Sequence, residues 1–144
     1  MKKLVDALKV LLADVVTEYF TAHGFHWNVE GIEFSQYHDL FEEIYSDIYG
    51  SIDPIAENIR KMDAYAPYTL TDFIKNRTIQ PAGVSPIPET MVQELLKLND
   101  GVLKSLNTAF KAATAADEQG IANFIAERID MHEKWRWQLR VSVK

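Results

Sequence analysis

The stretch FSQYHDLFEEIYSDIYGSIDPIAENIRKMDA, residues 34–64, decides the fold. Large apolar side chains recur in it every three or four residues, which is the period of an α-helix with one buried face. These side chains are Phe41, Ile44, Ile48, Ile55, Ile59 and Met62. Polar residues occupy most of the remaining positions, as on the solvated side of an amphipathic helix. The stretch therefore predicts one long helix that packs against other helices.

The same period continues on both sides of this stretch. It predicts further long helices over residues 3–28, 88–115 and 121–140. The pattern is interrupted at residues 28–31 and 117–120, where glycine and polar side chains are typical of turns. No alternating pattern competes with these helices, so we expect an all-α protein.

The segment between the second and third long helices differs in composition. Prolines at positions 67, 81 and 86 exclude a long helix from residues 65–87, although residues 70–76 retain a short amphipathic pattern. Four long helices with one long connection describe a ferritin-like four-helix bundle whose crossover contains a short helix. A cytokine bundle, the alternative with long connections, needs two of them. A chain of 144 residues fits one such domain, 1–144.

The charges are distributed unevenly along the chain, whose net charge is −6. Residues 1–72 contain 13 acidic and 5 basic side chains, whereas residues 73–144 contain 8 acidic and 10 basic ones. An acidic half argues against a general nucleic-acid binder and suits a protein that handles cations. A solvated helix surface is the simpler explanation of the same asymmetry.

The chain carries no cysteine, which excludes disulfides and thiolate metal sites and is consistent with a reducing cytoplasm. Its N-terminus, MKKLVDALKVLLADVV, is not expected to be a signal peptide because Asp6, Lys9 and Asp14 interrupt the apolar run. No run of about 18 apolar residues occurs. We therefore predict a cytoplasmic protein without a membrane segment.

Four potential metal ligands stand at defined spacings. His26 and His38 are twelve residues apart, Asp53 follows fifteen residues later, and Glu57 comes one helical turn after Asp53. Imidazole nitrogens and carboxylate oxygens bind iron, manganese or zinc. However, fifteen residues of helix separate His38 from Asp53 by roughly 22 Å, so no single metal reaches both within one chain. Either the residues are unrelated, or the site is assembled between two copies.

A helical-wheel projection favours the second alternative. If His38 is set at zero and each residue advances about 100°, then Glu42, Asp53 and Glu57 fall near 40°, 60° and 100°. The apolar stripe falls at roughly 240–320° on the same wheel. The candidate ligands therefore share a face that is separate from the core. An antiparallel second copy would bring His38 to Asp53 and Glu57 if the two-fold axis passed near residues 46–47, which would create two identical sites.

The stretch HWNVEGIEFSQYHDLFEEIYSDI, residues 26–48, followed by DPIAENI, residues 53–59, resembles the Dps proteins, or miniferritins. Their pattern is H-W-x-x-x-G, a histidine twelve residues after the first, and D-x-x-x-E fifteen residues further on. All of these spacings agree. The resemblance extends over the whole chain, including the crossover and the ending AERIDMHEKWRWQLR.

This resemblance implies a four-helix subunit that forms a hollow dodecamer. It implies ferroxidase sites at two-fold interfaces, where Fe(II) is oxidised preferably by hydrogen peroxide and stored as ferric oxide, which protects against oxidative damage. His26 and His38 would come from one subunit, and Asp53 and Glu57 from its neighbour.

Two neighbouring residues acquire roles from the same resemblance. Trp27 would lie close to the iron and could donate electrons to oxidising intermediates, with packing in the core as the alternative. Glu42 would face the cavity and help to bind iron, with an ordinary solvated position as the alternative.

The sequence departs from the family in two places. Many members bind DNA through a lysine-rich tail, but only Lys2 and Lys3 precede the first helix here, so DNA binding is expected to be weak or absent. Proline at position 54, directly after Asp53, is unusual for the family and could change the local geometry.

Three other functions compete with the ferroxidase hypothesis. A di-metal enzyme with its site inside one bundle needs Glu-x-x-His pairs, and the chain contains none. A DNA-compacting structural protein needs a basic tail or face. A helical bundle that binds zinc through His26, His38 and a carboxylate stays possible, since zinc competes well with Fe(II) for such ligands.

Overall fold

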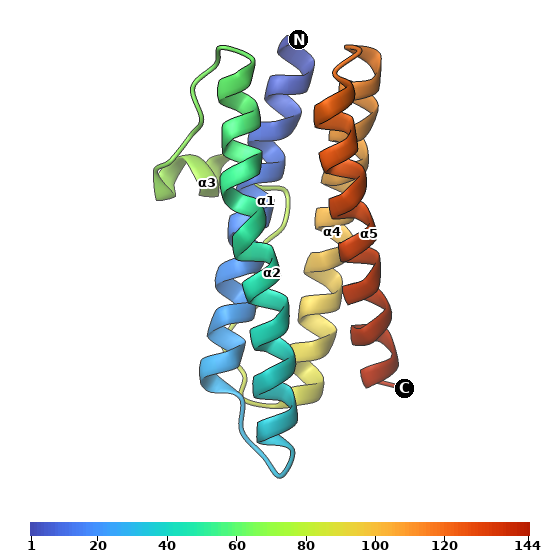
Figure 1. Ribbon diagram of the computed structural model, residues 1–144. Coiled ribbons are helices and arrows are strands. Elements are labelled where there is room, and N and C mark those ends of the chain that lie inside the picture. Colours follow the sequence, from blue (N-terminus) through green and yellow to red (C-terminus); the bar gives the residue numbers. More distant parts are fainter.

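The computed structural model describes residues 1–144 and contains five α-helices and no strand. The helices are α1 (Lys2–Asn28), α2 (Phe34–Lys61), α3 (Leu70–Asn76), α4 (Pro88–Ala115) and α5 (Gln119–Ser142). The four long helices run side by side along the molecule. The short α3 lies outside them and belongs to the crossover that connects α2 to α4 (Figure 1). The predicted four-helix bundle with a short helix in its crossover is therefore confirmed.

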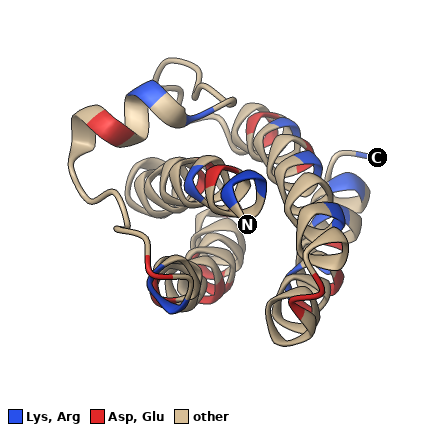
Figure 2. Ribbon diagram, turned by 90° about the horizontal axis from the view of Figure 1, so that it is seen from above, with Lys and Arg blue, Asp and Glu red and all other residues tan.

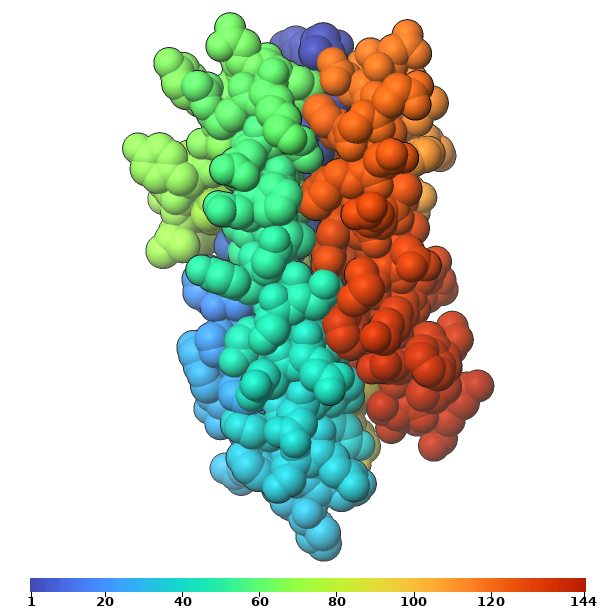
Figure 3. Space-filling view, in the orientation of Figure 1, coloured from blue at the N-terminus to red at the C-terminus, as the bar shows by residue number.

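The long helices form two antiparallel pairs, α1 with α2 and α4 with α5 (Figure 1). The chain leaves α2 at the end of the molecule where α1 begins, and α4 starts at the opposite end. The crossover must therefore run the length of the bundle, which explains why this connection is long. It also leaves α2 and α5 adjacent on one face (Figure 3).

The core is one cluster of 28 buried apolar residues contributed mainly by the four long helices. In α2, Phe41, Ile44, Ile48, Ile55 and Ile59 are each at most 1% exposed. Met62 is only partly buried at the end of the stripe. The acidic side chains at positions 42, 53 and 57 are exposed. The helical period of the sequence therefore identified both faces of α2.

Two helices differ from their predicted bounds by two or more residues. The second helix was expected to reach residue 64, but α2 ends at Lys61 because Asp63 has a φ of 60°, in the left-handed region. The amide groups of Met62 and Asp63 donate to the carbonyls of Ile59 and Arg60 at 3.1 and 3.0 Å, which closes the helix. The last helix extends beyond the expected 121–140 by two residues at each end.

A buried carboxylate holds the crossover against the bundle. Asp14 of α1 accepts hydrogen bonds from the amide and hydroxyl of Thr78, both at 2.6 Å, and from the Ser105 hydroxyl of α4 at 2.5 Å. The amide of Ile79 donates to the same carboxylate at 3.3 Å. Asp14 thus joins α1, α4 and the crossover, and it positions the Ile79 side chain over α4.

Gly101 of α4 lies directly beneath Ile79. A Cβ atom added at Gly101 would overlap Ile79 Cγ2. We expect Gly101→Ala to lower the free energy of unfolding by about 1–3 kcal/mol, because the packed crossover would have to move. Urea unfolding at constant protein concentration measures this change.

Gly24 is a matched control for this substitution. It also lies within a helix, but its added Cβ would meet no atom within 4 Å. Gly24→Ala should therefore stabilise the protein, by about 0.5–1 kcal/mol. If Gly101→Ala behaved like Gly24→Ala, the packing of the crossover on α4 would be contradicted.

An ion pair between buried Arg128 and partly buried Asp47 connects α2 and α5 halfway along the bundle. Arg128 donates to both carboxylate oxygens of Asp47 at 2.8 Å, and Trp135 Nε1 donates to the same carboxylate at 2.7 Å. Burial alone would raise the pKa of Asp47, but the hydrogen bonds from Arg128 and Trp135 outweigh it and lower the pKa below its ordinary value. Asp47 is therefore ionised and neutralises Arg128.

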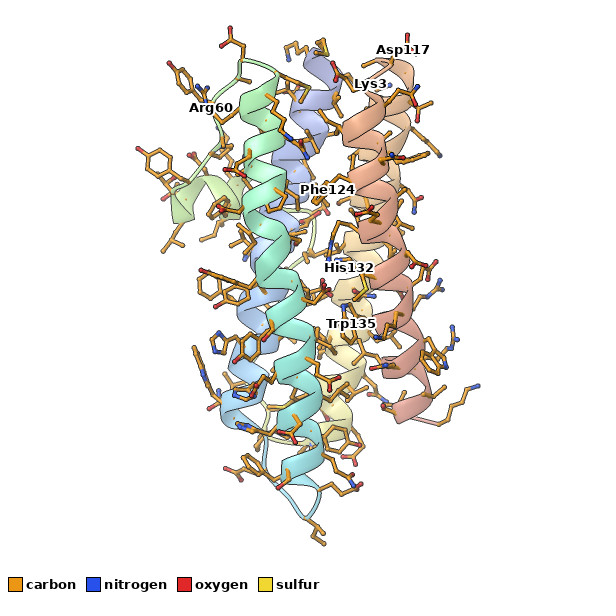
Figure 4. The ribbon with its side chains drawn as sticks, in the orientation of Figure 1. Lys3, Arg60, Asp117, Phe124, His132 and Trp135 are labelled. Atoms are coloured by element: carbon orange, nitrogen blue, oxygen red, sulfur yellow. The ribbon has the colours of Figure 1, made fainter.

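A neutral histidine and a neutral glutamate adjoin this pair. His132 is completely buried; its Nδ1 donates to Asn99 Oδ1 at 2.8 Å, and its Nε2 accepts from Arg128 at 3.0 Å. Burial, together with the Arg128 charge, lowers the pKa of His132 to about 3. Glu18 Oε1 lies 3.4 Å from His132 Nδ1, yet burial raises the pKa of Glu18 well above 4.5, so this contact is not an ion pair. Figure 4 shows His132 and Trp135 projecting from α5 toward the other helices.

The neutral pair leads to a prediction about pH. In the pH range just above 4.5, unfolded Glu18 is ionised and unfolded His132 is protonated, whereas both are neutral in the folded subunit. The two states therefore bind the same number of protons at these residues, so the pair adds no pH dependence to stability there. In Glu18→Gln only His132 contributes. Because its pKa is lowered in the folded state, its contribution to stability is fully present above pH 6.5 and is lost as the pH falls. Stability of this variant should rise by about 1.4 kcal/mol per pH unit relative to the parent.

Urea unfolding across this pH range, at constant ionic strength, tests the prediction. Glu133→Gln serves as the control, because Glu133 is exposed and pairs only with Arg136. Its pH profile should run parallel to that of the parent. A Glu18→Gln profile that also runs parallel to the parent would contradict the neutral pair.

Candidate metal centre

The turn between α1 and α2 brings together two of the predicted ligands. His26 lies in the last turn of α1, and His38 lies near the start of α2. Gly31 adopts a φ of 129° in the connecting turn, a conformation that glycine adopts without strain. The two imidazole rings stack with their centroids 3.6 Å apart. Residues that are twelve apart in sequence are therefore in direct contact.

The two histidines fix each other's tautomer. Nδ1 of His26 donates to the carbonyl of His38 at 2.8 Å, and Nδ1 of His38 donates to the carbonyl of His26 at 2.7 Å. Each Nε2 consequently keeps its lone pair, which is the form of imidazole that binds a metal. Holding the rings by backbone carbonyls also reduces the entropy lost when an ion binds.

Glu42 completes a group of three potential ligands in the subunit. Its carboxylate and the two imidazoles each offer one ligand atom, and these atoms all lie within 4.8 Å of one another. Glu42 Oε1 is 3.9 Å from His26 Nε2. Glu42 is exposed, but it lies beside the two histidines. The alternative that it is only a solvated residue of α2 does not account for this position.

The other two predicted ligands lie elsewhere. Asp53 and Glu57 are exposed side chains more than three turns further along α2. The rise of the continuous helix separates Asp53 from His38 by roughly 22 Å and Glu57 from His38 by roughly 28 Å. Pro54 lies within α2, which continues through it. One subunit thus supplies two imidazoles and one carboxylate at one end of α2, and two further carboxylates nearer the other end.

Trp27 is 63% exposed, so the alternative that it packs in the core is wrong for the subunit. Its ring lies against His23, with the centroids 4.4 Å apart. It also follows His26 directly in the chain. The position is compatible with the predicted role beside the metal and leaves a large apolar surface uncovered.

A cluster of aromatic rings next to the histidines was not predicted. His23 stacks on Tyr45 at 3.9 Å, and its Nδ1 lies 2.9 Å from the Tyr19 hydroxyl. Burial lowers the pKa of His23, with a smaller contribution from His26, so the ring is neutral and accepts the phenolic hydrogen bond. Burial also raises the pKa of Tyr19. The spacing of four residues between Tyr19 and His23 was the only sequence signal of this cluster.

None of the helices is long and apolar enough to cross a membrane.

Comparison with known proteins identifies the family. The sequence matches the ferritin family, described as a ferritin-like domain, over residues 5–143. DNA protection during starvation protein 2 of Bacillus anthracis is 28% identical over 139 residues, which cover 96% of this chain and 95% of that protein.

Two solved structures extend this result. The crystal structure of Dps from Vibrio cholerae O1 superposes with a TM-score of 0.95 at 29% identity, covering 99% of this chain and 90% of that chain. Dps from Bacillus brevis gives a TM-score of 0.93 at 27% identity, covering 98% and 95%. The chain therefore belongs to the Dps family of the ferritin-like superfamily.

Proposed function

We propose that this protein is a ferroxidase that oxidises Fe(II), preferably with hydrogen peroxide, and stores the ferric product inside a hollow dodecamer in the cytoplasm. The observation that carries the proposal is the His26–His38 pair, whose rings are held by each other's backbone carbonyls with both Nε2 atoms available. Such a preorganised pair is typical of a metal site and unnecessary in a purely structural protein.

The site is completed between subunits. His26, His38 and Glu42 of one subunit face Asp53 and Glu57 of a second copy across a two-fold axis, so that each dimer contains two equivalent sites. The exposure of Asp53, Glu57 and Trp27 in the isolated subunit supports this arrangement, because a partner would cover them.

The chemistry follows from the ligand types. The neutral imidazoles bind Fe(II), and the anionic carboxylates stabilise Fe(III) once it forms. Reduction of one hydrogen peroxide to two waters takes up two electrons and two protons, and two Fe(II) ions supply the electrons. Peroxide consumed in this way is not available to form hydroxyl radicals with free Fe(II), which is the protective effect. Trp27, which directly follows His26 in the chain, is placed to donate electrons to oxidising intermediates.

Zinc is the expected competitor at this site, because it binds mixed nitrogen and oxygen ligands more tightly than Fe(II) does. DNA compaction is the weaker alternative function. Lysine and arginine segments are interspersed with acidic ones in Figure 2 and form no continuous basic face in that view.

Iron oxidation by the assembled protein tests the proposal. We expect an assembly of about 200 kDa for twelve copies of the 16.5 kDa chain. Anaerobic titration with Fe(II) and hydrogen peroxide should consume two Fe(II) per peroxide. The absorbance of the ferric product measures the oxidation, and a spin trap measures the hydroxyl radicals that are released. Assembled protein that oxidises no more iron than the buffer would overturn the ferroxidase. A monomer that oxidises iron at the full rate would overturn the shared site.

A further inference from the structure

The aromatic cluster beside the metal centre extends away from it along α1 and α2. The Tyr45 ring meets His26 edge to face, with the centroids 5.2 Å apart. Tyr19 is the next tyrosine, at 6.3 Å from Tyr45, and Tyr49 lies 5.2 Å beyond Tyr19. Each ring in the series is therefore a neighbour of the next, starting from a candidate iron ligand.

Tyr19 differs from the other two tyrosines in its hydrogen bond. Its hydroxyl lies 2.9 Å from Nδ1 of His23, and that imidazole stacks on Tyr45 with an interplanar angle of 11°. A phenol is oxidised easily only if its proton leaves together with the electron, because the cation radical is a very strong acid. His23 provides an acceptor for that proton. No hydrogen bond holds the hydroxyl of either Tyr45 or Tyr49 within the chain.

We propose that Tyr19, with Tyr45 as the bridging ring and His23 as the proton acceptor, supplies one electron to peroxide when the adjacent centre holds only one Fe(II). This relay rests on the proposed ferroxidase function. It adds a second electron donor that the ligand set does not contain, and Tyr45 and Tyr49 lie along α2 between His38 and Asp53 of the same chain.

The electrons and protons of this step balance as follows. Peroxide takes two electrons and two solvent protons and becomes two waters. One electron comes from Fe(II), which becomes Fe(III), and the other comes from Tyr19, which becomes a neutral tyrosyl radical as its phenolic proton moves to Nδ1 of His23. A second Fe(II) later returns one electron to the radical, and His23 returns the proton, so that both side chains are restored.

The experiment uses the assembled protein in which every tyrosine carries ring deuterium. It is loaded with less than one Fe(II) per centre, mixed with hydrogen peroxide and frozen for electron paramagnetic resonance. We expect a tyrosyl signal whose hyperfine pattern narrows with the label, which distinguishes it from a radical on Trp27. Tyr19→Phe should abolish this signal and increase the yield of spin-trapped hydroxyl radical. His23→Gln should delay the signal, because its amide is a poor proton acceptor.

Two further variants keep the test decisive. Tyr45→Phe retains Tyr19 and its hydrogen bond but replaces the bridging ring with one that resists oxidation, so the signal should weaken even if Tyr19→Phe fails to assemble. Tyr65→Phe is the matched control, because Tyr65 is 84% exposed on the crossover and its ring lies beneath the Arg60 guanidinium, outside the aromatic cluster. Its signal should equal that of the parent.

The possible failures are distinguishable. A parent protein that oxidises no Fe(II) with peroxide overturns the ferroxidase and the relay together. A parent that oxidises iron but shows no tyrosyl signal, or a signal that persists in Tyr19→Phe, overturns the relay alone. Aromatic packing without redox function would change assembly or thermal stability in these variants and would not produce a labelled radical.

Discussion

Subunits that lack both histidines and subunits that lack both carboxylates are expected to be almost inactive alone and to recover activity when they are assembled together. The first variant is His26→Ala with His38→Ala, and the second is Asp53→Asn with Glu57→Gln. Loss of groups that merely orient a ligand reduces metal affinity or activity roughly 10–100-fold, so loss of two direct ligands should slow Fe(II) oxidation by at least about 100-fold.

Recovery follows from the symmetry of the proposed interface. In a dimer of one subunit of each kind, one site pairs intact histidines with intact carboxylates, and the other pairs only substituted residues. Random pairing makes half of the dimers mixed, so about a quarter of all sites should be complete. Unfolding the two variants together and reassembling them should therefore restore about a quarter of the parent rate.

The control for this experiment is Asp39→Asn with Glu43→Gln, which removes two exposed acidic groups of α2 that are not in the ligand set. Its rate should stay close to that of the parent. Mass spectrometry establishes that mixed assemblies have formed. If mixed assemblies form and no activity returns, then the histidines of one subunit do not share a site with the carboxylates of its neighbour. The inter-subunit site would then be rejected.

Replacement of Arg128 by methionine should produce the largest loss of stability of any change considered in this chain. Arg128→Met leaves the carboxylate of Asp47 without its counter-charge, with only the Trp135 hydrogen bond remaining. Breaking a fully buried ion pair by removing one partner costs about 3–5 kcal/mol, and because the Asp47 side chain is 20% exposed we expect a loss at the lower end, about 3 kcal/mol. The loss should appear as a lower urea midpoint and a lower melting temperature at a fixed protein concentration.

Arg136→Met is the matched control. Arg136 is also an arginine of α5 and pairs with Asp100 and Glu133, at 3.2 and 3.4 Å, but it is exposed. Exposed pairs are worth about 0–1 kcal/mol, so this change should have little effect. Adding Asp47→Asn to Arg128→Met should restore part of the lost stability, because no uncompensated charge then remains. Equal losses in the two methionine variants would show that the Arg128 pair is not desolvated.

The helices could be predicted because their periodicity is a local property. The apolar stripe of α2 requires only that residues three and four apart lie on one face, and every large aliphatic or aromatic member of that stripe up to Ile59 is buried. The predicted end of this helix was wrong by three residues because a stop at Asp63 depends on one residue entering the left-handed region. Asp allows that conformation but does not require it.

Charged residues on an apolar face were harder to interpret. Glu18 and Asp14 occur four residues apart on the buried side of α1, where the helical pattern predicts apolar side chains. Their partners come from 60 to more than 100 residues away: Thr78 and Ser105 for Asp14, and His132 for Glu18. His132 is likewise buried on α5, and the neutral state of both His132 and Glu18 depends on burial that only the packed bundle creates.

The sequence by itself determined the helices, the long crossover and the set of candidate ligands, including the conclusion that His38 cannot share a metal with Asp53 of its own chain. That conclusion needed only the rise per residue of a helix. The tertiary structure decided which side chains meet: the reciprocal hydrogen bonds of His26 and His38, the addition of Glu42, and the contact of Tyr19 with His23. These contacts depend on the rotation and offset of α1 against α2 and on the path of the turn that connects them. They cannot be predicted from the periodicity of a single helix.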